Sequence, residues 1–279
     1  MFAKLLKHDF RSNALALSIL SAATVGMGIA AGFLLRLITQ YEDFVNNTEE
    51  AGEAFYALVM SGSIISMSFC ILGMIGSFVA TFIILLIRYY RSRFTDQGYL
   101  TFTLPVKNHH IFLSALLNIV IWMLIAWAAL TIGITATILI GTTGTEFSPS
   151  DVIEYFGYYT ELPTGYVVAA GIDTVVTAIY TVVIAMTCIT LASTWVKRNR
   201  ILLAFGLYYG VSQVVGTLES AFSVFTLIGG AEDPFYGDVT AIYNDSIIAV
   251  VLMIIVKLGF IAGGYILSTQ LTKKKLNLS

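Results

Sequence analysis

Charged residues interrupt the apolar runs of this 279-residue chain at four positions: Arg36, Asp173, Glu219 and Lys257. A charge inside an apolar run is costly to bury, so it usually has a partner or a function. Arg36 lies close to the end of its run, where a long side chain can reach water. The other three lie roughly 12 to 20 Å from the corresponding ends of their runs, at about 1.5 Å per helical residue. We therefore expect them to pair, with one lysine between two carboxylates.

Two roles are open for a group made of Asp173, Glu219 and Lys257. In the first, the group is a buried ion pair that fixes how the helices pack. In the second, it contacts a substrate or acts as a conformational gate, because intramembrane charges commonly mark such pathways. We take the packing role as the first expectation and the substrate or gate role as the alternative.

The rest of the sequence lacks the motifs of an enzyme. The phosphate-binding pattern G-x-x-x-x-G-K-[ST] and the zinc pattern H-E-x-x-H are absent from the sequence. The histidines, His8, His109 and His110, lie outside the apolar runs, and Cys70 and Cys188 lie inside them, as small apolar side chains do. We expect no catalytic residue, metal, cofactor or nucleic acid in this chain, and favour transport or scaffolding over catalysis.

The composition indicates that the segments that carry these charges lie in lipid. Hydrophobic residues make up 57% of the chain and charged residues only 11%, whereas soluble domains carry roughly 25% charged residues. A helix needs about 20 apolar residues to cross a bilayer. The sequence predicts an all-α integral membrane protein with six transmembrane helices, over residues 14–38, 55–87, 111–140, 165–195, 201–228 and 246–270. The region 216–233 either completes the fifth span or bends into a short re-entrant helix.

The distribution of charge predicts the orientation of the spans. Of the 15 Lys and Arg residues, 13 fall in one set of segments, and 13 of the 17 Asp and Glu residues fall in the other. Cytoplasmic loops are rich in Lys and Arg. We therefore expect both termini in the cytoplasm, with residues 271–279 as a cytoplasmic tail and three acidic loops outside.

The amino end, MFAKLLKHDFRSN, has an amphipathic pattern. Phe2, Leu5, Leu6 and Phe10 recur at helical spacing, and the basic residues are offset from them. This predicts a helix over residues 1–13 that lies in the membrane interface. The alternative is a frayed basic start that only fixes the topology.

Residues 88–110 form the loop after the second predicted span. This segment is too polar to cross the bilayer and unusually apolar for a solvated loop. It begins with a basic and aromatic stem, RYYRSRF, and continues as TDQGYLTFTLPVKNHH. Gly98 can end the helical stem by adopting a positive φ, and Pro105 stops further helix. A short apolar segment between two stems suits docking in a groove of another protein. The alternative is a membrane-surface loop without a protein partner.

These stretches carry a resemblance to a known family. The start MFAKLLKHDFRS, the segment DQGYLTFTLPV after a basic stem and the six spans resemble the permease subunits of bacterial ABC transporters. More narrowly, they resemble the six-span exporter-type permeases of Gram-positive bacteria. Asp96-Gln97 stands where such proteins are expected to have Asp-Glu.

The resemblance implies a single transmembrane permease domain over residues 1–279, in the bacterial cytoplasmic membrane. It implies that residues 1–13 are the elbow helix along the inner leaflet. It implies that residues 88–110 are the cytoplasmic coupling loop that contacts the ATPase, and that residues 197–200 make a smaller contact with the same subunit. It implies two copies of a separate ATPase subunit, which would bind ATP and Mg, and a second permease copy or paralogue. It also implies short outer helices between the last two spans. The coupling contacts would come from Arg91, Arg93, Phe94, Asp96, Gly98, Tyr99, Leu100, Phe102, Leu104 and Pro105.

We therefore expect an ATP-driven exporter subunit. The acidic outer loops favour a cationic or amphipathic substrate, such as an antimicrobial peptide, through their local field. Two alternatives remain: a secondary transporter driven by an ion gradient through Asp173, Glu219 and Lys257, and a membrane scaffold or sensor without transport.

Overall fold

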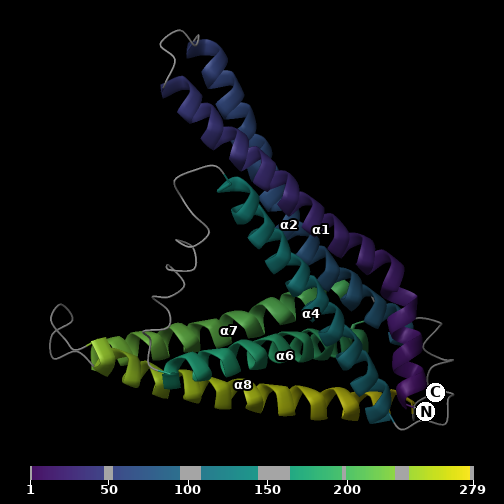
Figure 1. The fold of residues 1–279 in the computed structure, drawn as a ribbon. Coiled ribbons are helices and arrows are strands. Elements are labelled where there is room, and N and C mark those ends of the chain that lie inside the picture. The colour runs from purple at the N-terminus through teal and green to yellow at the C-terminus, as the bar shows by residue number, and fades with distance from the viewer. Residues whose placement is uncertain are drawn as a thin grey trace. The chain divides into compact units, whose positions relative to one another are not determined.

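The computed structural model describes residues 2–46, 53–94, 108–143, 164–196, 199–229 and 239–276. Every regular element in these described ranges is an α-helix (Figure 1). The helices are α1 (Phe2–Asn46), α2 (Glu53–Phe94), α4 (Asn108–Gly141), α6 (Thr164–Trp195), α7 (Arg200–Gly229) and α8 (Val239–Leu276).

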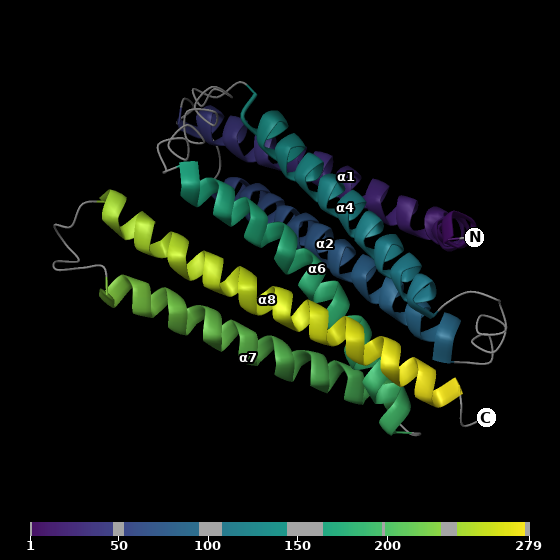
Figure 2. The same ribbon diagram turned by 90° about the horizontal axis from the view of Figure 1, so that it is seen from below.

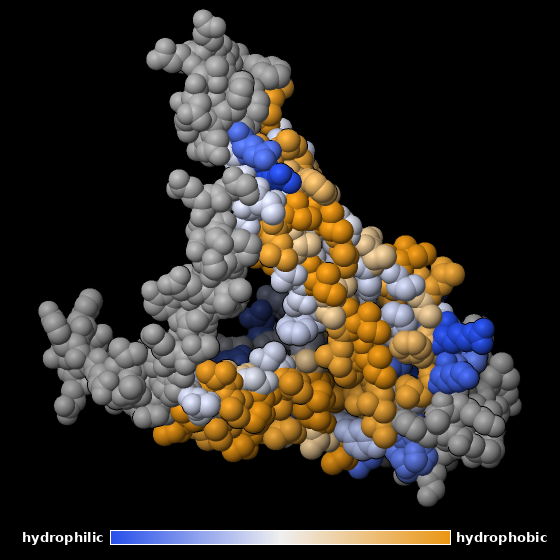
Figure 3. Space-filling model, in the orientation of Figure 1, coloured by the Kyte–Doolittle hydropathy of each residue, from blue (hydrophilic) through white to orange (hydrophobic). Residues whose placement is uncertain are grey.

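All six helices are long and apolar enough to cross a membrane, with candidate spans of 23 to 37 residues. Large apolar side chains such as Leu15, Leu202 and Trp195 are exposed on their surfaces. In Figure 3 the visible surface along the helices is mostly apolar. A water-facing surface would not carry so much exposed Leu and Ile, so this is a multi-pass membrane protein. The prediction of an all-α protein with six spans is confirmed.

The helices extend beyond the predicted spans, and two of them bear on questions that the sequence left open. Helix α1 is continuous from Phe2 to Asn46, with no helix end near Asn13. A separate interfacial helix over residues 1–13 therefore stays a prediction. Helix α7 is continuous to Gly229 and does not re-enter. Unbroken helix satisfies every backbone hydrogen bond in lipid, which a re-entrant bend does not do by itself.

The chain divides into two compact units, and each is described by itself. One unit contains Leu6–Leu85 and Ile121–Gly157, which bring together α1, most of α2 and the second half of α4. The other contains Met1–Leu5, Leu86–Val120 and Tyr158–Ser279, which bring together α6, α7 and α8 with the end of α2 and the start of α4.

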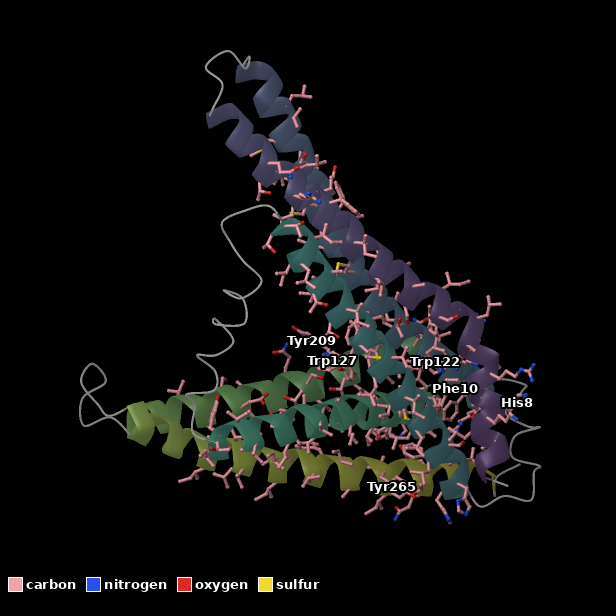
Figure 4. The ribbon with its side chains drawn as sticks, viewed as in Figure 1. His8, Phe10, Trp122, Trp127, Tyr209 and Tyr265 are labelled. Carbon is pink, nitrogen blue, oxygen red and sulfur yellow. The ribbon has the colours of Figure 1, made fainter. Side chains whose placement is uncertain are left out.

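In the first unit, small residues let the backbones of α1 and α4 approach closely. Gly28 of α1 faces Gly133 of α4, and the Thr137 hydroxyl donates to the Gly28 carbonyl over 2.8 Å. Phe10 of α1 stacks on Trp122 of α4, with ring centroids 4.7 Å apart (Figure 4). Close approach at small residues, with a polar side chain across the contact, is a common way to pack helices in lipid.

Gly28→Ala is expected to destabilise this unit, because an added Cβ would lie 2.5 Å from the Cα of Gly133. Overpacking against backbone costs about 1–3 kcal/mol. Gly26→Ala is the matched control, since a Cβ there meets nothing within 4 Å. Thermal unfolding in detergent, followed by circular dichroism, should give a lower midpoint for Gly28→Ala alone. Equal midpoints for the two variants would contradict this packing.

In the second unit, α6, α7 and α8 run side by side (Figure 2). Their core contains Tyr180, Ile184, Cys188, Val215 and Met253. Helices α6 and α8 approach closely at Gly264 of α8, where an added Cβ would lie 2.9 Å from the Thr187 hydroxyl. One turn further along α8, Ser268 donates to the same Thr187 hydroxyl over 3.2 Å. These contacts set α8 against α6.

Described residues next to the ends of α6 and α7 link the two helices. Asn199 has a φ of 61° and immediately precedes α7. Asparagine is one of the few non-glycine residues that adopt this left-handed conformation readily. The Arg200 side chain then donates to the Val196 carbonyl over 3.0 Å, which links the two helix ends. Helices α6 and α7 also pack against each other along their length.

Candidate functional site

The three predicted intramembrane charges meet at one point in the bundle of α6, α7 and α8. The Lys257 ammonium on α8 donates to Asp173 Oδ1 and Oδ2 on α6, over 2.9 and 3.0 Å. It also donates to Glu219 Oε1 on α7, over 2.8 Å. The structure thus brings together residues that are 38 to 84 positions apart in sequence. We call this group, with the threonine described next, the ion cluster.

Thr177 is the fourth member of the ion cluster. Its hydroxyl accepts a hydrogen bond from the Lys257 ammonium over 2.8 Å and lies 3.5 Å from Asp173 Oδ2, to which it donates. An ammonium group has three donors and no acceptor. Asp173, Glu219 and Thr177 supply four acceptor oxygens for these three donors. The lysine is therefore fully satisfied by three side chains from α6 and α7.

The ion cluster is unevenly buried. The Lys257 side chain is 2% exposed, whereas the side chains of Asp173 and Glu219 are 23% and 46% exposed. The cation thus lies inside the bundle, and the two carboxylates extend toward its surface. With both carboxylates ionised the cluster carries a net charge of one negative unit. In a low-dielectric setting these charge-assisted bonds are stronger than the same bonds in water.

The chemistry of this arrangement is recognition of a cation by oxygen atoms. Within the described residues, no group of three or more His, Cys, Asp and Glu could hold a metal ion. The oxygen cage is filled by the lysine of the same chain. Another cation could occupy it only if Lys257 moves away, so the cluster can act either as a lock between helices or as an exchangeable site.

Thr177→Val is expected to destabilise the bundle, because it removes an acceptor of the Lys257 ammonium while keeping the shape of the side chain. A hydrogen bond to a buried charge contributes about 2 kcal/mol. Thr174→Val is the matched control, since its exposed hydroxyl only bonds the Ala170 carbonyl in its own helix. Urea or thermal unfolding in detergent measures both. An equal effect of the two variants would argue against the hydrogen bond to Lys257.

Three predicted coupling residues lie at the end of α2, and they face different environments. Arg91 is exposed. Arg93 is 9% exposed, donates to the Ile111 carbonyl of α4 and lies over the Tyr89 ring, 4.7 Å from its centroid. Phe94 is half-buried and contacts the rings of Tyr89 and Tyr90. Arg93 thus holds the end of α2 against the start of α4.

The remaining predicted coupling residues lie outside the described residues: Asp96, Gly98, Tyr99, Leu100, Phe102, Leu104 and Pro105. The same holds for Lys197 and Arg198 in the second predicted cytoplasmic loop. The docking prediction for the loop therefore stays a prediction.

Contacts beside these stems were not predicted from the sequence. The Tyr89 hydroxyl lies 3.2 Å from the Thr190 hydroxyl of α6. Phe112 of α4 meets Tyr265 of α8, with ring centroids 5.4 Å apart; Figure 4 shows Tyr265 on α8. The spacing of Tyr89 and Arg93, four residues apart, placed them on one helix face. Asp173 and Thr177 are also four residues apart. This spacing was the feature of the sequence that could have predicted Thr177 as the fourth member of the ion cluster.

The fold and the site define the class of protein: a six-span α-helical membrane protein with a lysine held between two carboxylates in its spans. No protein-family model, curated protein or solved structure matches the chain. The function is therefore argued from the residues themselves.

Proposed function

We propose that this protein is the transmembrane subunit of an ATP-driven ABC transporter, acting as an exporter with a separate ATPase subunit. The observation that supports it best is the contact between the end of α2 and the start of α4. These two helix ends flank residues 95–107, the predicted coupling segment, and we call them its stems. Arg93, at the end of α2, is buried and bonds the Ile111 carbonyl at the start of α4. A loop that transmits force needs stems that move together, and this contact ties them.

The contacts of the stems offer a path from the loop to the ion cluster. Tyr89 connects the end of α2 to α6 through Thr190, and Phe112 connects the start of α4 to α8 through Tyr265. Helices α6 and α8 carry Asp173 and Lys257. A push on the loop would therefore reach the helices that hold the ion cluster. Movement of packed helices as rigid bodies is an established way to switch a protein between two states.

The proposal includes the partners and the setting that the sequence resemblance implies. Two ATPase subunits bind ATP and Mg, and a second permease copy or paralogue completes the pathway. The chain lies in the cytoplasmic membrane of a bacterium with both termini inside, and residues 1–13 lie along the inner surface. The acidic outer segments favour a cationic or amphipathic substrate, such as an antimicrobial peptide.

The ion cluster supports a second candidate, a carrier driven by an ion gradient. Its oxygen cage would exchange Lys257 for a transported cation during the cycle. The two candidates differ in their energy source. The carrier transports in liposomes that contain this chain alone and stops when an uncoupler is added; the ABC subunit needs ATP and its partner.

The test of the main proposal is purification from the native membrane. The full chain, tagged at one terminus and expressed with its neighbouring genes, is extracted in a mild detergent. We expect a Walker-type ATPase to co-purify, with two copies for each pair of permease subunits, and the complex to hydrolyse ATP. Purification of the intact chain without any ATPase subunit, under conditions that preserve its helices, contradicts the proposal.

A further inference from the structure

A tyrosine close to the ion cluster has a buried hydroxyl that no described residue bonds. Tyr180 follows Thr177 by three residues on α6, and it is 6% exposed. Its Oη has no hydrogen-bond partner among the described residues. Its packing neighbours include Val215 of α7 and Met253 and Phe260 of α8, which all belong to the described part of the chain. Burying a hydroxyl without a bond costs free energy, so the position of this group needs a reason.

The Tyr180 hydroxyl lies close enough to Glu219 of α7 to interact with its charge. Thr177 and Glu219 bond the same ammonium group. Further along, Cys188 of α6 interacts with Tyr208 of α7. The two helices therefore run in opposite directions. Because helical side chains point back toward the N-terminus of their own helix, Tyr180 points toward the ion cluster and Glu219 points toward Tyr180.

Glu219 is the member of the ion cluster that Lys257 needs least. The ammonium group has three donors, and Asp173 and Thr177 already supply three acceptor oxygens for them. The charges of Lys257 and Asp173 also balance each other, which leaves Glu219 with the excess negative charge. Glu219 is the most exposed of the three charged side chains. It can therefore leave the lysine without leaving a buried donor unbonded.

We propose that the Glu219 carboxylate has two positions: one on the Lys257 ammonium, as described, and one on the Tyr180 hydroxyl. In the second position Tyr180 Oη donates to the carboxylate, and Lys257 keeps Asp173 and Thr177 as acceptors. The first position ties α7 to α8, and the second ties α7 to α6. The exchange lets α7 move against α8 while α6 and α8 stay joined, which gives the bundle two states. Tyr180 is thus a positioning residue for Glu219, and this role does not depend on the proposed transport.

The test compares Tyr180→Phe in two backgrounds, the wild type and Lys257→Met, by thermal unfolding of the full-length protein in detergent. In the wild type the substitution removes a hydroxyl without a described partner, so the midpoint should fall by less than about 1 °C or rise. In Lys257→Met the carboxylate has lost its ammonium and takes the second position. There Tyr180→Phe should lower the midpoint by about 3 °C, the shift expected from losing one hydrogen bond to a charge.

Tyr208→Phe is the matched control, because the Tyr208 hydroxyl bonds the Ser212 side chain. It should lower the midpoint by the same amount in both backgrounds. An equal effect of Tyr180→Phe in the two backgrounds overturns the proposal, since the hydroxyl then has the same partner in both, such as a buried water. If Lys257→Met does not fold, Lys257→Gln supplies the second background, because its shorter, uncharged side chain does not hold both carboxylates.

A second comparison keeps Lys257 in place and tests whether Glu219 is the exchangeable member. Glu219→Gln should shift the midpoint by less than about 1 °C, because three acceptor oxygens for Lys257 remain. Asp173→Asn removes the side chain that bonds the ammonium through two oxygens. It should lower the midpoint by about 3 °C or more, or prevent folding. An equal loss in the two variants, or a greater loss in Glu219→Gln, overturns the proposal.

Discussion

Lys257→Met is expected to lower the free energy of unfolding by about 3 kcal/mol, the low end of the range for breaking a buried ion pair. The substitution removes the donor that Asp173, Glu219 and Thr177 share. It leaves two carboxylates in an apolar bundle without their counter-ion. We take the low end because the carboxylates are partly exposed, at 23% and 46%. Thermal unfolding in detergent, together with the yield of folded protein, measures the effect.

The matched control removes all three charges at once. In the triple variant Lys257→Met, Asp173→Asn and Glu219→Gln, no buried charge is left without a partner, so most of the lost stability should return. If Lys257→Met alone is as stable as the wild type, the ion cluster does not hold the bundle together. If the triple variant is no more stable than Lys257→Met, the loss comes from packing rather than from charge.

The same pair of variants separates the two roles that the sequence leaves open for the ion cluster. A cluster that only fixes helix packing allows the triple variant to transport at the wild-type rate once it is stable. A cluster that contacts substrate or acts as a gate leaves a stable triple variant without transport. The readout is uptake or export in reconstituted vesicles, compared at equal amounts of folded protein.

Tyr99→Asp or Phe102→Asp is expected to uncouple ATP hydrolysis from transport, with transport reduced by more than about tenfold, as placing a carboxylate in an apolar contact costs at least 1–3 kcal/mol. Both residues belong to the apolar part of the predicted coupling loop, YLTFTL. The spans should be unaffected, because neither residue lies in them. ATP hydrolysis and transport are measured on the same reconstituted complex.

Thr101→Asp is the matched control in the same loop. It adds the same charge at a position that is already polar, so it should leave most of the coupling in place. Unchanged coupling in Tyr99→Asp and Phe102→Asp would mean that the segment is a membrane-surface loop. An equal loss in all three variants would mean that the charge of the loop matters rather than its apolar side chains.

The helices were predictable because lipid allows few alternatives. An apolar run longer than about 20 residues must form a helix to satisfy its backbone, and all six runs did. The ends were less predictable, since helices can continue past the membrane. Helix α1 continues through residues 1–13, which the sequence had set apart, and α8 starts at Val239, seven residues before the predicted span.

The meeting of Asp173, Glu219 and Lys257 was predictable from their depth, because a buried charge requires a counter-charge at the same level. Depth does not show which helix faces turn toward each other. For that reason Thr177 was missed, although it lies four residues after Asp173 on the same face. Arg93 was expected to contact a partner protein, and its burial against Tyr89 and Ile111 depends on how α2 meets α4. The sequence does not carry that geometry.

The most direct measurement of the central claim is cross-linking from position 99 in living cells. In one variant a photoreactive amino acid replaces Tyr99. In a separate control variant it replaces Tyr158, in a predicted outer loop. After irradiation, the cross-linked products are isolated and identified by mass spectrometry. The account predicts an adduct with an ATP-hydrolysing subunit from position 99 and none from position 158. Adducts with lipid alone from position 99, in cells that also produce the ATPase of a neighbouring gene, would contradict it.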